Sequence, residues 1–161
     1  MKHFLMGMTI GLICGALAYS SHHECVCEEP HLPDDTVVLL EQPEFFLSDS
    51  ITIERLYEAC AYYEIQHPDI VVAQAVLETG FFKSDLCLNQ NNLFGLFNSK
   101  KMDFYAFNHW TESVKAYRNK VQYRYKEGDY YEWLEHIGYA EDSLYVSKLK
   151  NIREKYNLVT E

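Results

Sequence analysis

The 161-residue chain contains no run of basic residues, no metal-ligand spacing and little glycine or proline. With 7 Gly and 4 Pro, its composition is neither collagen-like nor of low complexity. The formal net charge is −10, and residues 1–99 hold only 3 of the 14 basic side chains against 14 of the 24 acidic ones. An acidic chain without a basic patch offers no footprint for a nucleic-acid backbone, so we exclude nucleic-acid binding. The five cysteines do not have the spacing of a zinc site, and we expect no metal and no cofactor.

Aromatic residues, by contrast, are abundant. They make up 15% of the chain, with 13 Tyr and 9 Phe, while apolar residues in total account for 48%. The length is sufficient for one domain with a real core and too short for two large ones. An aromatic surplus is typical of a protein that lines a groove, and equally of a small, densely packed core.

The amino-terminal segment has the parts of a secretory signal peptide. The short basic start Met1-Lys2-His3 precedes an apolar run that extends from Phe4 to Tyr19. At about 16 residues, this run is shorter than the roughly 20 that cross a bilayer. We therefore predict a signal peptide over residues 1–18, cleaved after Ala16-Leu17-Ala18, with an uncleaved anchor as the alternative. The mature protein would lie in the periplasm, the cell envelope or the medium, without a membrane span.

The mature chain divides into an arm and one domain. Residues 19–49 are acidic, contain three prolines and lack sustained periodicity, which indicates a linker or arm. Residues 50–161 form the domain, which we expect to be monomeric. In an oxidising compartment Cys60 and Cys87 would either pair or act as two small buried apolar residues.

Within this domain, apolar spacing predicts five helices around an irregular segment over residues 81–110. The first would lie between a cap at Ser50 or Thr52 and a stop at His67-Pro68. The others would span residues 68–78, 111–125, 129–137 and 142–156. The irregular segment is predicted to be a loop followed by a small hairpin. We also expect Ser84 to cap or brace the loop after residue 78.

Glu78 is the first candidate for catalysis. The helix over residues 68–78 is apolar around nearly its whole circumference, which is typical of a buried helix. Its polar residues in this body are Gln74 and Glu78, which share one face at i and i+4. Burial and the negative end of the helix dipole both raise the pKa of a carboxyl group, as a general acid near neutral pH requires. Alternatively, Glu78 emerges into solvent where Thr79-Gly80 end the helix.

Three segments in order resemble the glucosaminidase domain of glycoside hydrolase family 73, the bacterial autolysin and flagellar peptidoglycan hydrolase type. They are AQAVLETGFFKS at 73–84, NNLFGL at 91–96 and GYAED at 138–142, the last followed by Tyr145 and Lys148-Leu149. Trp110, Glu112 and Tyr117 match the weaker middle signature. The resemblance covers roughly residues 50–157.

The resemblance implies a mainly α (α+β), lysozyme-like fold, with a helical lobe and a small β-hairpin lobe around a glycan groove. It implies hydrolysis of the β-1,4 bond after N-acetylglucosamine in peptidoglycan glycan strands, with Glu78 as general acid and Tyr139 supporting the reaction centre. Asn92 and Phe94 match positions that shape the groove. Further candidates for substrate binding are Gln74, Phe82 and Trp110.

A second catalytic carboxylate is harder to assign. Glycosidases usually pair the acid with a second carboxylate about 5–9 Å away, and Glu112 and Asp103 flank the predicted hairpin. Both have simpler interpretations, Glu112 in a first helical turn and Asp103 as a solvated hairpin residue. The 2-acetamido group of the substrate would be the other route. A muramidase, a lytic transglycosylase and a non-catalytic peptidoglycan-binding module remain as alternative functions.

Overall fold

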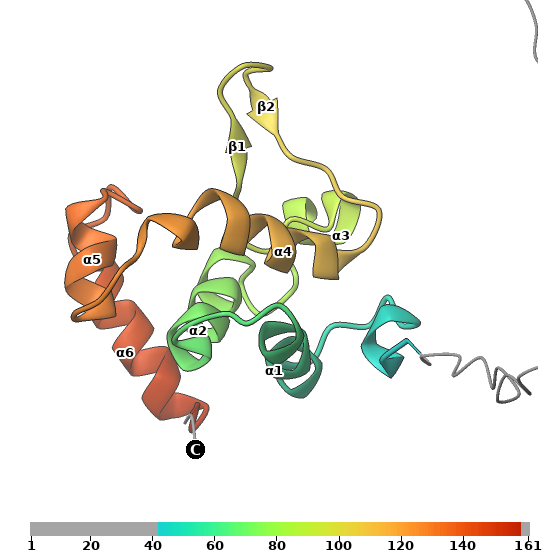
Figure 1. Cartoon of the computed structure of the whole chain (residues 1–161), viewed down its shortest axis with the longest axis horizontal. Helices are drawn as coiled ribbons and strands as arrows, with labels where there is room; N and C mark the ends of the chain where they lie inside the picture. Colours follow the sequence, from blue (N-terminus) through green and yellow to red (C-terminus); the bar gives the residue numbers. More distant parts are fainter. Residues whose placement is uncertain (1–41, 159–161) are drawn as a thin grey trace, which may run out of the picture. The chain divides into compact units, whose positions relative to one another are not determined.

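The computed structural model describes residues 42–158, which form short helices and one two-stranded antiparallel hairpin (Figure 1). The predicted signal peptide and most of the predicted arm lie outside the described residues. In chain order the elements are η1 (Glu44–Phe46), α1 (Ile53–Tyr62), α2 (Pro68–Glu78), α3 (Asp85–Gln90), β1 (Phe97–Asn98), β2 (Asp103–Phe104), α4 (Trp110–Lys120), η2 (Gln122–Arg124), α5 (Tyr130–His136) and α6 (Tyr145–Lys155).

The first two predicted helices are present, but α1 ends at Tyr62 and does not reach the predicted stop at His67-Pro68, because Glu64 turns the chain with a φ of 53°. The Thr52 hydroxyl caps α1 by accepting a hydrogen bond from the Arg55 N–H at 3.2 Å. Helix α2 begins at Pro68, whose missing N–H costs nothing in the first turn. It ends at Glu78 because the Thr79 hydroxyl donates back to the Ala75 carbonyl and accepts from the Phe82 N–H. The chain therefore turns sharply just after Glu78.

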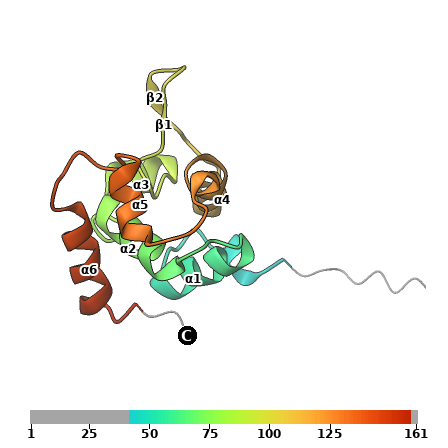
Figure 2. The ribbon, with the colours of Figure 1, turned by 60° about the vertical axis from the view of Figure 1, so that its left-hand side comes forward.

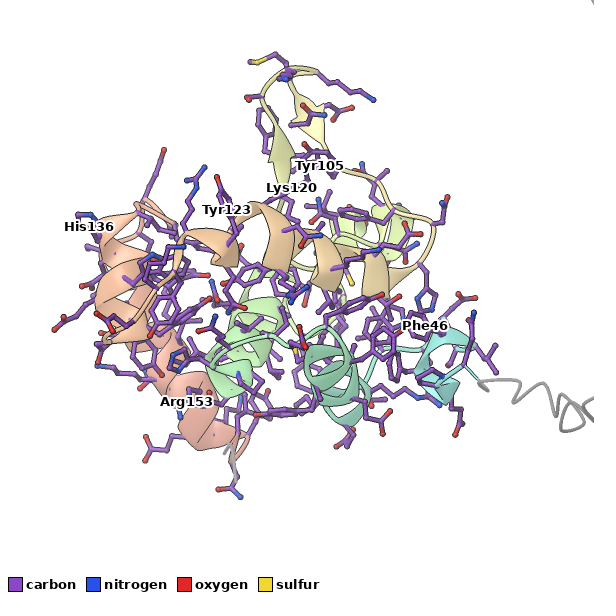
Figure 3. All side chains as sticks on the ribbon, viewed as in Figure 1. Phe46, Tyr105, Lys120, Tyr123, His136 and Arg153 are labelled. Atoms are coloured by element: carbon purple, nitrogen blue, oxygen red, sulfur yellow. The ribbon has the colours of Figure 1, made fainter. Side chains whose placement is uncertain are left out.

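Helix α2 is the centre of the helical part and packs against α1 and α6 (Figures 1 and 2). Every residue of α2 from Asp69 to Val76 is buried, so this helix is covered on all sides over most of its length. At its start the buried Asp69 forms an ion pair with Arg153 of α6, which Figure 3 shows low on that helix. The Arg153 guanidinium also donates to the Tyr131 hydroxyl at 2.8 Å. These bonds attach α6 to both α2 and α5.

The segment 81–110 is more regular than predicted. It contains helix α3, which the sequence pattern missed because six residues are too few for a recognisable period. Ser84 caps this helix by accepting from the Cys87 N–H at 3.3 Å, in agreement with the role expected for it. Two other helices are shorter than predicted. Helix α4 ends at Lys120, and α6 starts at Tyr145 because the Asp142 carboxylate binds the Leu144 N–H in a turn before it.

The predicted hairpin is present and projects away from the helices (Figures 1 and 2). Phe97 pairs with Phe104 and Asn98 with Asp103. The Asn98 side chain accepts hydrogen bonds from the Lys100 and Lys101 N–H groups, which closes the turn. With two residues in each strand, the β-lobe is small.

Cys60 and Cys87 are buried free thiols, so the interpretation as small apolar core residues is the one that the structure supports. No helix within residues 42–158 has the length and apolar character needed to cross a membrane.

The Asp69–Arg153 pair yields a test of how α6 is held. Replacing Asp69 with Asn leaves the Arg153 guanidinium without its counter-charge, which should lower the free energy of unfolding by about 2–3 kcal/mol. Urea denaturation followed by circular dichroism measures this value. The matched control is Glu64→Gln, which breaks the exposed Glu64–Arg118 pair and should have a much smaller effect. Equal losses in the two variants would contradict the assigned role of Asp69.

Candidate active site

A groove of about 730 Å³ runs between the hairpin and the end of α4. Figure 3 shows Tyr105, Lys120 and Tyr123 along this part of the molecule, near the base of the hairpin. Glu78 reaches the groove from the end of α2. The complete lining consists of Glu78, Leu86, Phe94, Gly95, Leu96, Phe97, Phe104, Tyr105, Asn119, Lys120, Val121, Tyr123 and Tyr139.

The two carboxyl oxygens of Glu78 have different surroundings. Oε1 accepts a hydrogen bond from the Tyr145 hydroxyl at 2.8 Å. Oε2 lies towards Gly95, at 3.8 Å from the position that a Cβ on this glycine would occupy. Gly95 has φ +60°, a conformation that favours glycine, and its missing side chain leaves the space beside Oε2 open. Glu78 is thus anchored through Oε1, while Oε2 lies beside the space left by Gly95.

The pKa of Glu78 is raised above its ordinary value because the carboxyl group is partly removed from water. The hydrogen bond from Tyr145 opposes this rise, since it stabilises the ionised form. The side chain as a whole remains solvent-accessible in the groove. A carboxyl group in this setting keeps its proton to a higher pH than an ordinary Glu and can deliver it to a bound molecule.

Tyr139 lines the same groove from the turn between α5 and α6. Its hydroxyl donates to the Phe94 carbonyl at 3.2 Å. Burial, together with the neighbouring charge of Glu78, raises the pKa of Tyr139 well above its usual range. The hydroxyl is therefore neutral at physiological pH and acts as a hydrogen-bonding group.

Asn92 organises the loop that carries Phe94. Its amide nitrogen donates to the carbonyls of Leu96 and Tyr105, both at 2.9 Å, and its amide oxygen accepts from the Leu96 N–H at 2.9 Å. Asn92 is 1% exposed, so it shapes the groove from behind. Phe94 is also largely buried, with its ring 4.5 Å from that of Tyr117, and contributes an edge to the lining.

Three residues expected to bind substrate lie elsewhere in the structure. Gln74 is fully buried, because it sits one turn, about 6 Å, further from the helix end than Glu78. Trp110 is also fully buried, and its indole N–H donates to the Ser48 carbonyl at 3.0 Å. Phe82 lines a separate hollow beside the start of α1. None of these three residues belongs to the lining of the groove.

Neither candidate for the second carboxylate lines the groove. Asp103 accepts a hydrogen bond from the Phe104 N–H at 2.8 Å and is otherwise exposed. Glu112, in the first turn of α4, accepts from the Asn108 N–H at 3.1 Å. Over residues 42–158, Glu78 is the only carboxylate in the groove lining. The same part of the chain holds no cluster of three or more His, Cys, Asp or Glu side chains suited to a metal ion.

Sequence reasoning missed several residues of the groove. Phe97 and Phe104 are directly opposite in the hairpin, with ring centroids 5.4 Å apart, and both are exposed. Tyr123 is 57% exposed and comes from η2, a stretch predicted to continue a helix. The signal for the two phenylalanines was the hairpin register, which places opposite residues on one face. No comparable sequence signal marked Tyr123.

The sequence profile of the glucosaminidase family, described as mannosyl-glycoprotein endo-beta-N-acetylglucosaminidase, matches residues 53–158. The chain belongs to the glucosaminidase family. It is therefore a glycoside hydrolase, and family membership supports action on peptidoglycan. The predicted fold class, mainly helical with one small β-hairpin, is confirmed for this glucosaminidase domain. The match includes every element from α1 to α6.

Among solved structures, the catalytic domain of the autolysin Auto from Listeria monocytogenes is similar to this glucosaminidase. The identity is 23%, the TM-score is 0.48, and the match covers 76% of this chain and 90% of that one. No curated protein matches the chain.

The exposed aromatic pair of the hairpin yields a test of the groove. Replacing Phe104 with Ala removes apolar surface that a bound glycan would cover, so KM should rise about three- to tenfold with kcat nearly unchanged. Steady-state kinetics on soluble glycan fragments measures both values. Met102→Ala is the matched control, because Met102 is 76% exposed in the same hairpin but does not line the groove. If Met102→Ala raised KM equally, this groove would not be the binding site.

Proposed function

We propose that the chain is an exported peptidoglycan hydrolase, an endo-β-N-acetylglucosaminidase with Glu78 as general acid. It would cleave the β-1,4 bond after N-acetylglucosamine in the glycan strand. The observation that carries this proposal is the position of Glu78 as the only carboxylate lining the groove, within the described part of a glucosaminidase. The amino-terminal sequence supports export, which would bring the enzyme to its polymer.

In the first step, protonated Glu78 donates its proton to the glycosidic oxygen as the bond from that oxygen to C1 breaks. The raised pKa of Glu78 supports this role, because the group must be protonated when the substrate binds. The proton leaves from the carboxyl oxygen that faces the groove. Glu78 then becomes a carboxylate and can serve as the base for the second step.

The 2-acetamido group of the substrate would act in place of a second carboxylate. Its carbonyl oxygen attacks C1 as the leaving oxygen departs, which forms a cyclic oxazolinium. Water then adds to C1, the C1–oxygen bond of the ring opens, and ionised Glu78 takes the proton of that water. This route is supported by the positions of Asp103 and Glu112, which bind backbone N–H groups outside the groove.

Tyr139 would support the reaction centre as a neutral hydrogen-bonding group beside Glu78. The exposed aromatic rings of Phe97, Phe104 and Tyr123 offer apolar faces for sugar rings. Asn92 and Phe94 would act indirectly by fixing the loop that borders the acid.

The first test is digestion of purified peptidoglycan by the wild-type protein and by Glu78→Gln. New product ends are reduced with borohydride and identified by mass spectrometry. We expect reduced N-acetylglucosamine ends from the wild type and a loss of about 10²–10⁴-fold in rate for the variant. Wild-type activity should also decline as the pH rises through the pKa of Glu78, because only the protonated form is active.

Other product ends would indicate that the enzyme cleaves a different bond or forms a different product. Muramic acid ends would indicate a muramidase, and anhydro ends a lytic transglycosylase, with Glu78 still as the acid. Sedimentation on the polymer without cleavage would indicate a binding module and contradict the enzymatic role of this protein.

A second test concerns the missing carboxylate. If the acetamido group is the nucleophile, Asp103→Asn and Glu112→Gln should each retain activity within about threefold, since neither would touch the reacting atoms. A thiazoline analogue of the oxazolinium should inhibit competitively, and the new anomeric centre should retain the β configuration in NMR spectra of early products. An inverted product would exclude the acetamido route, whatever the fate of Glu78→Gln.

A further inference from the structure

A continuous chain of hydrogen bonds runs from the loop after α1, through the core, to Glu78. We call it the polar chain, and its members are Gln66, Gln122, Tyr130, Tyr117, Gln74, Tyr145 and Glu78. The four middle side chains from Tyr130 onwards are at most 8% exposed. Groups this deeply buried must satisfy their hydrogen bonds with one another, since water is not available to them.

The direction of the polar chain is fixed at its far end. The Gln66 N–H donates to the Gln122 amide oxygen at 2.9 Å, and the Gln122 amide nitrogen donates to the Gln66 carbonyl at 2.7 Å. A peptide N–H can only donate and a carbonyl can only accept, so these two bonds determine which way the Gln122 amide points. The amide nitrogen of Gln122 therefore faces Tyr130 and donates to its hydroxyl at 3.0 Å.

The orientation of the Gln122 amide determines which group donates in each following hydrogen bond of the polar chain. Among the described residues the Tyr130 proton has no acceptor other than the Tyr117 oxygen, 2.9 Å away, so Tyr130 donates to Tyr117. Tyr117 in turn donates to the Gln74 amide oxygen at 2.7 Å. The Gln74 nitrogen then faces Tyr145 and donates to its hydroxyl at 3.3 Å. Tyr145 has one proton left, and it is donated to Glu78 Oε1 at 2.8 Å.

From Gln122 onwards each member thus donates to the next one towards Glu78, and Oε1 is always an acceptor. When Glu78 is protonated, its proton must lie on Oε2, the oxygen beside Gly95. Hydrogen bonds that run in one direction also polarise one another, which strengthens the last bond onto the carboxylate that forms during the reaction.

We propose that Tyr145 is a positioning residue for the glucosaminidase reaction, at the end of a directional hydrogen-bond chain that holds the acidic proton of Glu78 on its groove-facing oxygen. This inference rests on the proposed function of Glu78 as general acid. It also assigns a positioning role to Gln74, whose amide connects the hydroxyl groups of Tyr117 and Tyr145.

Tyr145→Phe tests the proposal, with Tyr57→Phe as the matched control. Tyr57 has a buried hydroxyl without a hydrogen-bond partner among the described residues and lies outside the polar chain. Since a bond to a charged acceptor is lost, Tyr145→Phe should lower kcat about 10- to 100-fold while KM changes less than about twofold. Tyr57→Phe should leave both values unchanged.

The pH profile separates positioning from a merely structural role. Without the Tyr145 hydroxyl, the ionised form of Glu78 loses a stabilising bond and its pKa rises. The alkaline limb of the kcat profile should therefore move to higher pH in Tyr145→Phe and stay in place in Tyr57→Phe. An unchanged limb, or a rise in KM alone, would overturn the assignment of Tyr145.

A measurement on the wild-type protein does not depend on how the variants fold. The buried Tyr145 hydroxyl proton should exchange slowly enough for NMR, and its chemical shift should follow the ionisation of Glu78. A shift that is insensitive to this ionisation would reject the proposal. If Glu78→Gln retained full activity, the proposed function itself would fail, whereas an inactive Glu78→Gln with a fully active Tyr145→Phe would reject only the positioning role.

Discussion

The burial of a polar amide on α2 is the constraint on which the site depends. Gln74 lies in a helix that is covered on all sides, and an unsatisfied amide there would cost several kcal/mol. Tyr117 from α4 and Tyr145 from α6 satisfy it, so these two helices must meet α2 at this level. The same contacts bring the Tyr145 hydroxyl to Glu78. The packing of α4 and α6 that satisfies the buried Gln74 amide therefore also orients the Glu78 carboxyl group.

The helical framework could be predicted because each main helix carries its own local signals. Thr52 as a cap, Pro68 as a first residue and the apolar body of α2 are readable without any knowledge of the neighbours. Glu78 could be found for the same reason, since its place at the end of a buried helix is a local property of the sequence. The three motifs then indicated the glucosaminidase family, and with it a helical lobe and a small β-hairpin lobe.

The rest of the site depends on which segments meet, and no local signal carries that information. The groove lining joins the end of α2 to the hairpin and to η2, which are 19 or more residues away in the chain. Trp110 and Phe82 have the composition of sugar platforms but face the core and another hollow. Tyr145 was visible in the motif, yet its hydrogen bond to Glu78 requires the docking of α6 on α2.

The two buried thiols have a consequence for how the chain acquires its structure. Burial raises the pKa of Cys60 to about 12 and raises that of Cys87, so almost none of either sulfur is in the reactive thiolate form once the domain has folded. The unfolded chain has no such protection. If the protein is exported as proposed, closure of the core competes in time with oxidation of these sulfurs.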